Sequence, residues 1–158
     1  MMKIYGGAME NKQKVINDLL VDIFNDILII EQKTISYGEY KDISVTEIHT
    51  IEAIGISNLK SMSEIAAELN ITVGTLTTAI NNLVKKGYVE RQKSESDRRV
   101  VKISLTKKGK LVHRLHEMFH CDMVMSSIQG LTEHEIDVLV RSLDKLNNFF
   151  RDKYKISK

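Results

Sequence analysis

Apolar residues between Thr72 and Lys86 recur at intervals of three and four, which predicts a helix with one buried face. Leu76, Ile80 and Leu83 form that face. The opposite face has neither a charged nor a large apolar side chain, and it consists of Gly74, Thr75, Thr78, Asn81 and Asn82. Because a surface helix usually carries Glu and Lys there, we expect this helix to hydrogen-bond a polar surface such as the major groove of DNA. A solvated polar face is an equally good interpretation of the helix alone.

The residues after Gly87 predict a β-hairpin with a charged turn. Gly87 ends the helix, residues 88–91 start one strand, and residues 100–105 form a second strand with alternating apolar and polar positions. The turn carries Arg98 and Arg99 near its tip, and arginine at a projecting tip can enter the narrow minor groove of DNA. A solvated turn is the commoner fate of such a sequence, but here the turn follows a polar helix. Met62 is expected to pair with the hairpin as a third small strand.

Basic residues are concentrated in the same part of the chain. Residues 72–114 contain eleven Lys and Arg but three Asp and Glu, a local charge of +8, whereas the whole chain has a net charge of +2. The remainder of the chain is therefore acidic, with a charge of −6. This concentration fits contacts with phosphate groups, and it fits a membrane surface less well because no apolar amphipathic face accompanies it.

Two shorter helices are expected before the polar helix. Residues 44–47 have the capping-box pattern and open the first of them. Ser63 is expected to cap a short helix over residues 64–69, and Thr72 to cap the polar helix after a tight turn. Two short helices joined by a brief turn, of which the second has a polar outer face, form a helix-turn-helix.

Long helices are expected on both sides of this region. Residues 12–36 are apolar over most of a helical circumference, so a partner subunit, a ligand cavity or the rest of the domain must bury them on several sides. Thr106 is expected to cap a helix that extends to about residue 127. Residues 132–135 repeat the capping-box pattern and open a last amphipathic helix. Two over-hydrophobic terminal helices predict dimerisation through the ends of the chain.

The sequence therefore predicts a mainly α, winged-helix (α+β) protein of six helices and a two- to three-stranded β-wing. We expect an N-terminal dimerisation helix at 12–43, a winged helix-turn-helix DNA-binding domain at 44–106, C-terminal dimerisation helices at 107–154, and disorder at 1–11. The chain lacks a signal-type or membrane-crossing apolar run, which predicts a cytoplasmic protein without a membrane partner. The single cysteine, Cys121, excludes an internal disulfide framework.

Several motifs, taken in order, resemble the MarR family of winged-helix transcription regulators. Besides the helix-turn-helix they are GYVER at 87–91, DRR at 97–99 and LTKKG at 105–109. Three further segments are similar to one subgroup, the fatty-acid-synthesis repressors of Gram-positive bacteria, and these segments cover residues 23–31, 42–51 and 113–120. The polar helix also fits that subgroup. The first dozen residues and the segment after Met125 do not match visibly, so nothing is carried over there.

The resemblance implies a homodimeric repressor of fatty-acid biosynthesis genes that binds a palindromic operator in double-stranded DNA. It also implies long-chain acyl groups on acyl carrier protein as the corepressor. By position, one wing arginine enters the minor groove while Asp97 orients an arginine through a charge-assisted bond. Thr75, Thr78 and Asn81 are expected at base edges. The full set of expected DNA-binding residues is Ser63, Thr72, Gly74, Thr75, Thr77, Thr78, Asn81, Asn82, Lys85, Lys93, Asp97, Arg98 and Arg99.

An acyl chain requires an apolar tunnel, and the resemblance favours one between the first helix, the helix after Ser44 and the helix after Thr106. The expected lining residues are Phe24, Ile27, Leu28, Ile30, His49, Ile51, Ile54, His113, His116, Phe119 and His120. From spacing alone, a plain dimer core is the better interpretation of these apolar positions.

The histidines allow an alternative effector. His113, His116 and His120 lie on one helical face, and with Glu47 and His49 they could form a zinc site. Because the subgroup resemblance covers the same histidines, a structural or pocket-lining role is favoured, and neither a metal site nor a cofactor is predicted. A MarR-type regulator that responds to zinc or to a small phenolic ligand is the alternative. A redox switch at Cys121 would require an exposed thiol with a lowered pKa.

The sequence does not predict an enzyme. It has no Gly-rich phosphate loop, no paired-cysteine site and no supported Ser/His/Asp pattern. The alternative from another class of function is a helical protein-interaction dimer that does not bind DNA. That alternative predicts no salt-dependent DNA affinity, whereas a DNA-binding regulator predicts affinity that falls steeply as salt rises.

Overall fold

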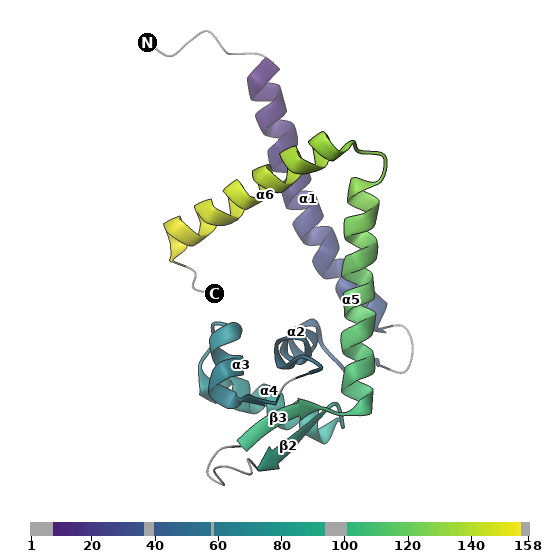
Figure 1. Cartoon of the computed structure of the whole chain (residues 1–158), viewed down its shortest axis with the longest axis vertical. Coiled ribbons are helices and arrows are strands. Elements are labelled where there is room, and N and C mark those ends of the chain that lie inside the picture. Colours follow the sequence, from purple (N-terminus) through teal and green to yellow (C-terminus); the bar gives the residue numbers. More distant parts are fainter. Residues whose placement is uncertain (1–7, 37–39, 58, 94–100, 156–158) are drawn as a thin grey trace. The chain divides into compact units, whose positions relative to one another are not determined.

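A computed structural model describes residues 8–36, 40–57, 59–93 and 101–155 of the 158-residue chain. The described residues form six helices and three strands in the order α1-α2-β1-α3-α4-β2-β3-α5-α6 (Figure 1). They belong to two units, residues 1–46 and residues 47–158, and each is described by itself. The predicted mainly α winged-helix fold is confirmed.

The first unit contains α1, a helix of 29 residues from Ala8 to Ser36. The helix begins before the predicted Lys12, because Ala8 and Met9 are good helix formers and Glu10 places an acid near the positive helix N-terminus. The prediction of disorder is therefore wrong for residues 8–11, and residues 1–7 lie outside the described residues. Large apolar side chains are exposed along α1, namely Val15, Ile16, Leu19, Val21, Ile23, Phe24, Leu28, Ile29 and Ile30.

The second unit contains a winged helix-turn-helix. Its helices are α2 (Val45–Ile54), α3 (Met62–Glu68) and α4 (Val73–Lys85). Its strands are β1 (Lys60–Ser61), β2 (Val89–Lys93) and β3 (Val101–Leu105), which form an antiparallel sheet in the order β1-β3-β2. In this register Val89 pairs with Leu105, and Lys60 pairs with Ile103. The sheet thus ties the hairpin to the segment that leads into α3.

The start of α3 differs from the prediction. Ser61, not Ser63, is the N-cap, and its hydroxyl accepts a hydrogen bond from the Glu64 backbone N–H while the Glu64 carboxylate accepts one from the Ser61 backbone N–H. This reciprocal pair is a complete capping box, because Glu64 lies three residues after Ser61. The third strand ends at Ser61, so Met62 is the first residue of α3 and not a strand residue.

The core of the winged helix is built from one face of each helix and from the sheet. The buried apolar residues of the second unit are Ile48, Ile51, Ala53, Ile54, Ile65, Ala66, Leu76, Ile80, Leu83, Tyr88, Val89, Ile103, Leu105 and Val112. The predicted inward face of α4, formed by Leu76, Ile80 and Leu83, is confirmed, since all three side chains are completely buried.

The end of α4 is joined tightly to the start of α5 (Lys107–Ile128). Gly87 adopts a φ of +78°, a left-handed conformation that ends α4. The Thr106 hydroxyl, which caps α5, donates to the Gly87 carbonyl at 2.7 Å. At Gly109 a Cβ atom would lie 2.1 Å from the Tyr88 carbonyl oxygen, so only glycine allows α5 to approach so closely. The position of α5 is therefore coupled directly to that of α4.

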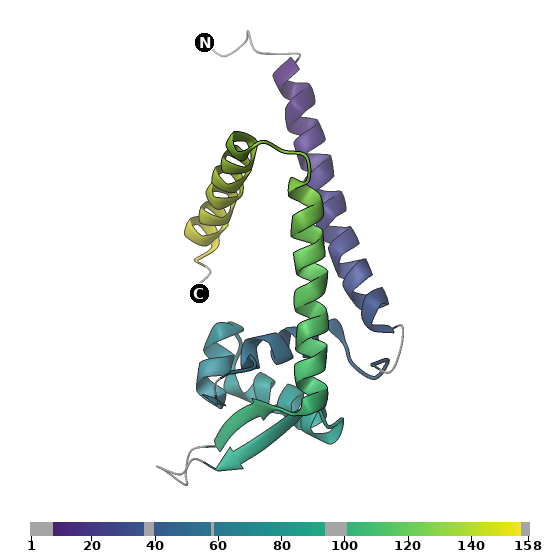
Figure 2. The same ribbon diagram turned by 45° about the vertical axis from the view of Figure 1, so that its right-hand side comes forward.

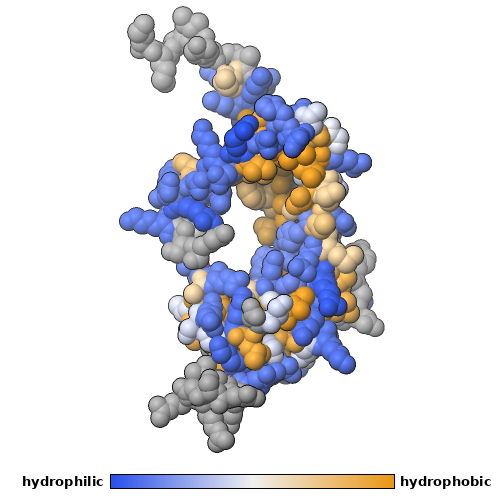
Figure 3. All heavy atoms as spheres, in the orientation of Figure 1, coloured by the Kyte–Doolittle hydropathy of each residue, from blue (hydrophilic) through white to orange (hydrophobic). Residues whose placement is uncertain are grey.

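α5 leaves the end of β3 as one straight helix, and α6 (Glu133–Tyr154) follows after a turn (Figure 2). The Thr132 capping box at the start of α6 is confirmed. Hydrophobic residues gather on the surface where α5 ends and α6 begins (Figure 3), among them Met125, Leu131 and Val138. None of the helices in the described part of the chain is long and apolar enough to cross a membrane.

Candidate nucleic-acid interface

The outer face of α4 is exposed and uncharged over its first three turns. Every expected contact residue of α4 is solvent-exposed, and the set is Thr72, Gly74, Thr75, Thr77, Thr78, Asn81, Asn82 and Lys85. Thr72 is the N-cap, as predicted, and its hydroxyl accepts a hydrogen bond from the Thr75 backbone N–H at 3.1 Å. The first turn carries no acid, so the positive end of the helix dipole is not offset by a carboxylate there. This end of α4 suits an approaching anion such as a phosphate group.

Gly74 leaves space beside α4, whereas several threonine hydroxyls of the same face already form hydrogen bonds within the helix. A Cβ atom at Gly74 would meet the Thr72 hydroxyl at 3.7 Å, and no other atom of the described chain would lie within 4 Å. The fold itself therefore does not require glycine at this position, and glycine leaves room for a close neighbour outside the chain. The Thr77 hydroxyl donates to the Val73 carbonyl at 2.7 Å, whereas Thr72 and Thr75 bond each other through their hydroxyls at 2.9 Å. The hydroxyl proton of Thr77 is thus used within the helix, which leaves its oxygen as an acceptor.

Asn81 is linked to the hairpin by a residue that the sequence did not single out. Arg91 of β2 donates from Nη2 to the Asn81 side-chain oxygen at 2.6 Å. The bond fixes the Asn81 amide and places an exposed guanidinium beside the recognition face of α4. In the sequence, Arg91 stands out only as part of the local charge and of the GYVER motif, because its position next to Asn81 depends on the fold.

The wing residues are only partly described. Lys93 is the last residue of β2, and Asp97, Arg98 and Arg99 lie in residues 94–100, outside the described residues. Their expected roles in the minor groove stay predictions. The strands that lead to the tip are present, with Lys93 paired to Val101 at the end of the ladder. Ser63 is exposed on the first turn of α3, which is compatible with its expected phosphate contact.

Two of the basic side chains, Lys86 and Lys108, bind groups of the chain itself. Lys86, the C-cap of α4, donates to both carboxylate oxygens of Glu47 at 2.8 and 2.7 Å. Lys108 lies 3.9 Å from the centre of the Tyr88 ring and donates to the Lys86 carbonyl. These two lysines hold α4 against α2 and α5, so they contribute less to DNA binding than the charge count implies. Because Lys86 binds both oxygens of the Glu47 carboxylate, the fold does not favour the expected place of Glu47 in a zinc site.

A network of exposed charges supports the helix-turn-helix from the α3 side. The hydrogen bond from the Ser61 backbone N–H, together with the Ser61 hydroxyl and the nearby Lys102, lowers the pKa of Glu64 to about 2. Lys102 lies 3.5 Å from this carboxylate. Lys60 binds Glu68 and the Ala53 carbonyl, each at 2.6 Å. Glu64 and Glu68 of α3 are thus each paired with a lysine.

The expected acyl-binding residues divide between the two units. In the first unit, Phe24, Leu28 and Ile30 are exposed on α1 and Ile27 is half-buried. In the second unit, Ile51 and Ile54 have no exposed surface and belong to the winged-helix core. His116 and His120 meet each other on α5 beside Phe119 and His49, while His113 lies against Glu117, with 3.3 Å between the Nδ1 and Oε2 atoms. The tunnel stays a prediction.

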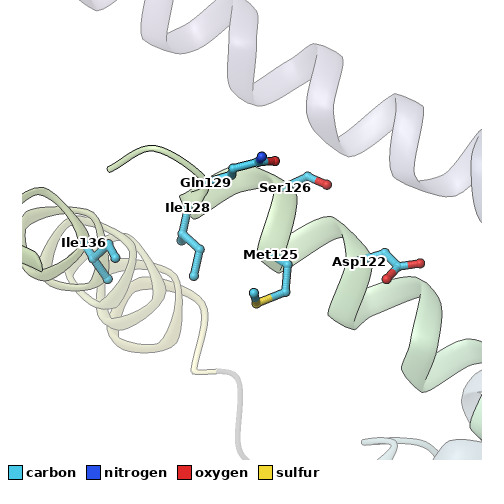
Figure 4. A pocket seen from close by; sticks show the side chains of 6 residues that line it. All are labelled: Asp122, Met125, Ser126, Ile128, Gln129 and Ile136. Carbon is cyan, nitrogen blue, oxygen red and sulfur yellow. The ribbon is translucent and has the colours of Figure 1, made fainter. Parts of the chain in front are cut away.

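A separate cavity lies between α5 and α6. It has a volume of about 760 Å³ and is lined by Asp122, Met125, Ser126, Ile128, Gln129 and Ile136 (Figure 4). None of these residues was among the expected ligand-binding residues. Met125, Ile128 and Ile136 are the apolar members of this lining (Figure 4).

Comparison with known proteins agrees with this geometry. Residues 43–101 match the family model for the MarR family. The fold is similar to the crystal structure of Streptococcus pneumoniae FabT in complex with DNA, with a TM-score of 0.81 and 47% sequence identity over 89% of this chain and 98% of that one. The HTH-type transcriptional regulator SarZ of Staphylococcus saprophyticus is 34% identical over 65% of this chain and 70% of its own length.

A third relative is covered less completely. The HTH-type transcriptional regulator YhjH of Bacillus subtilis is 27% identical, and the match covers 65% of this chain but 60% of that regulator. The family and the fold are those of transcription regulators rather than enzymes, and the alternative of a helical adaptor that does not bind DNA is set aside. From the polar outer face of α4, the wing strands and these matches, we conclude that the chain belongs to the MarR family of DNA-binding transcription regulators.

Proposed function

We propose that this regulator represses fatty-acid biosynthesis genes by binding a palindromic operator as a homodimer, with long-chain acyl groups on acyl carrier protein as corepressor. The observation that carries the DNA part is the exposed, uncharged face of α4, on which Gly74 leaves open space beside Thr75 and Thr78. The fatty-acid part is supported by the motif resemblance over residues 23–31, 42–51 and 113–120 and by the 47% identity to FabT.

In this proposal α4 lies in the major groove and its hydroxyl and amide groups read base edges. Thr75, Thr78 and Asn81 make the base contacts, since threonine and asparagine can bond bases that expose donors and acceptors there. Ser63, Thr72, Lys85 and Lys93 bind phosphates and set the register of the helix on the duplex. Arg98 or Arg99 probes the adjacent minor groove while Asp97 orients one of them.

The homodimer is supported by the apolar faces that the described chain leaves uncovered. Within α6, which is described in full, no residue is buried, although Val138, Val140, Leu143, Phe149 and Phe150 are large and exposed. Contiguous apolar surface of this kind marks an interaction site. We assign it to a second copy of the chain, because two recognition helices related by a two-fold axis match the two half-sites of a palindrome.

A gel-shift experiment on the promoter of the organism's own fatty-acid synthesis cluster tests the proposal. We expect the protein to shift this fragment, and long-chain acylated carrier protein to strengthen the shift relative to the unacylated carrier. The variants Arg98→Ala and Arg99→Ala should weaken binding, and Asn148→Ala on the polar side of α6 is the control. If the protein binds other operators but not this promoter, the assignment to fatty-acid genes is wrong. If both carrier proteins act alike, the corepressor assignment is wrong.

A further inference from the structure

Arg91 and Asn81 form a pair at the edge of the recognition face of α4. The Arg91 guanidinium donates from Nη2 to the Asn81 side-chain oxygen at 2.6 Å, a charge-assisted bond between residues ten positions apart. Both side chains are exposed. A guanidinium has only donors, so the oxygen of the Asn81 amide, and not its NH2 group, must face Arg91. The chemistry of the pair therefore determines how this amide is oriented.

The joint between α4 and β2 fixes where Arg91 lies. α4 ends in a Schellman motif, in which the Tyr88 N–H donates to the Leu83 carbonyl at 2.9 Å. The Gly87 N–H donates to the Val84 carbonyl at 3.0 Å, and the φ of +78° at Gly87 allows the chain to reverse. Because only this turn separates the helix from the strand, hydrogen bonds set the direction in which β2 leaves α4.

The alternation of side chains along β2 places Arg91 on the side that packs on the core. Val89, two residues earlier on the same side, is 2% exposed. Glu90 and Gln92 lie on the opposite side, where the Gln92 amide donates to the Glu90 carboxylate at 3.1 Å. Arg91 thus continues the buried row of β2 to the edge of the core, and there its guanidinium reaches α4.

The bond changes what Asn81 can offer to a base. A free asparagine reads adenine through two bonds, since its oxygen accepts from the N6 amino group while its NH2 group donates to N7. With Arg91 on the oxygen, the N6 amino group of adenine would meet the N–H donors of the guanidinium. Guanine instead exposes two acceptors in the major groove, N7 and O6. The Asn81 NH2 group and the other N–H groups of Arg91 can both donate to them.

We propose that Arg91 and Asn81 act together to select guanine at one position of each operator half-site, with Arg91 as the specificity-determining residue. Within the described residues, neither side chain forms another hydrogen bond or ion pair, so both can turn their remaining donors to a base. The inference rests on the placement of α4 in the major groove that is proposed above, and it adds the base that this part of the helix reads.

Selection from a library of random DNA sequences tests the proposal without assuming which genes are regulated. Asn81→Ala identifies the position, because it should lose base discrimination there and at no other position. We expect the wild type to bind guanine at this position about tenfold or more tightly than adenine in fluorescence anisotropy. Arg91→Ala should abolish this preference or reverse it, since the Asn81 oxygen is then free to accept from adenine. Arg91→Lys should restore a preference for guanine, because lysine also only donates.

Two matched variants separate specificity from charge and from folding, and circular dichroism establishes that each variant is folded. Lys85→Ala removes one positive charge from the exposed end of α4, so it should weaken binding to all sequences alike and keep the base preference. Gln92→Ala, on the opposite side of β2, should bind as the wild type does.

The outcomes distinguish this inference from the proposed function. If Arg91→Ala keeps the guanine preference of the wild type while Asn81→Ala loses it, Arg91 does not set the specificity and the inference is overturned, although α4 still reads DNA. If the wild type selects no sequence, the proposed placement of α4 in the major groove is wrong, and the inference is wrong with it.

Discussion

α4 and α6 are both amphipathic helices that begin at a threonine N-cap, yet they lie in opposite environments. α4 buries Leu76, Ile80 and Leu83 completely within the winged helix, and its exposed face is polar. α6 leaves Val140 58% exposed and Leu143 53% exposed. Amphipathicity predicts that a face will be covered but does not say by what. For α4 the cover comes from its own unit, whereas α6 has no buried residue, and we propose that a second copy of the chain covers it.

The largest expected effect concerns the buried face of α4. Ile80→Ala should lower the free energy of unfolding by about 2–5 kcal/mol, because it removes a fully buried side chain and leaves a cavity. Val84→Ala, at a side chain that is 36% exposed on the same helix, is the matched control and should cost much less. Chemical denaturation gives both values. Equal losses would mean that α4 is not packed as the structure places it.

The apolar face of α6 should control association instead. Leu143→Glu should weaken the dimer by about 2 kcal/mol, roughly thirtyfold, because a carboxylate would be buried in the subunit contact. Lys145→Gln, a change at a neighbouring exposed polar residue, should leave the dimer intact. Sedimentation measurements at several protein concentrations distinguish the two variants. A dimer that tolerates Leu143→Glu would remove α6 from the interface.

The N-cap threonines of α4 and α6, Thr72 and Thr132, allow an effect on stability to be separated from an effect on operator affinity. Thr72→Ala and Thr132→Ala each remove a side-chain acceptor from a helix N-terminus and should each cost about 1 kcal/mol of stability. Operator affinity, measured by fluorescence anisotropy, should fall only for Thr72→Ala, since this variant removes the hydroxyl that we propose binds a phosphate. If both variants bind DNA as the wild type does, Thr72 has a structural role alone.

The smallest effect is a pH dependence at the start of α3. Its capping bonds lower the pKa of Glu64 from 4.5 to about 2, so ionised Glu64 stabilises the folded chain above pH 4.5. That contribution is lost as the pH falls from 4.5 through about 2. Glu64→Gln should therefore flatten the decline of stability in this window, as followed by thermal unfolding between pH 2 and pH 5. An unchanged pH profile would show that the box does not form in solution.

Local patterns predicted much of the fold. The caps at Thr72, Thr106 and Thr132 depend on neighbouring residues only, and all three are present. The cap predicted at Ser63 was wrong because it was placed two residues after the actual N-cap, Ser61. Ser61 and Glu64 have the spacing of a capping box, so this signal was available in the sequence.

The errors at the site have a different origin. Arg91 meets Asn81, and Lys86 meets Glu47 from a position 39 residues away, only after the sheet and helices have packed. A count of basic residues cannot separate a lysine that binds Glu47 from one that is free to bind phosphate. The contact between His116 and His120 follows from their spacing on one helix, whereas the contact of His116 with Glu52 required the fold.

Operator affinity of the Thr75→Val and Thr78→Val variants tests the central claim most directly, because valine keeps the shape of threonine and removes only its hydroxyl. Fluorescence anisotropy on the bound promoter fragment should show each variant about tenfold weaker than the wild type, near the ~1–3 kcal/mol of a specific base contact. Asn148→Ala, on the polar side of α6, should bind as the wild type does. Unchanged affinity in both valine variants, with the dimer and the fold intact, would contradict the assignment of the outer face of α4 to DNA.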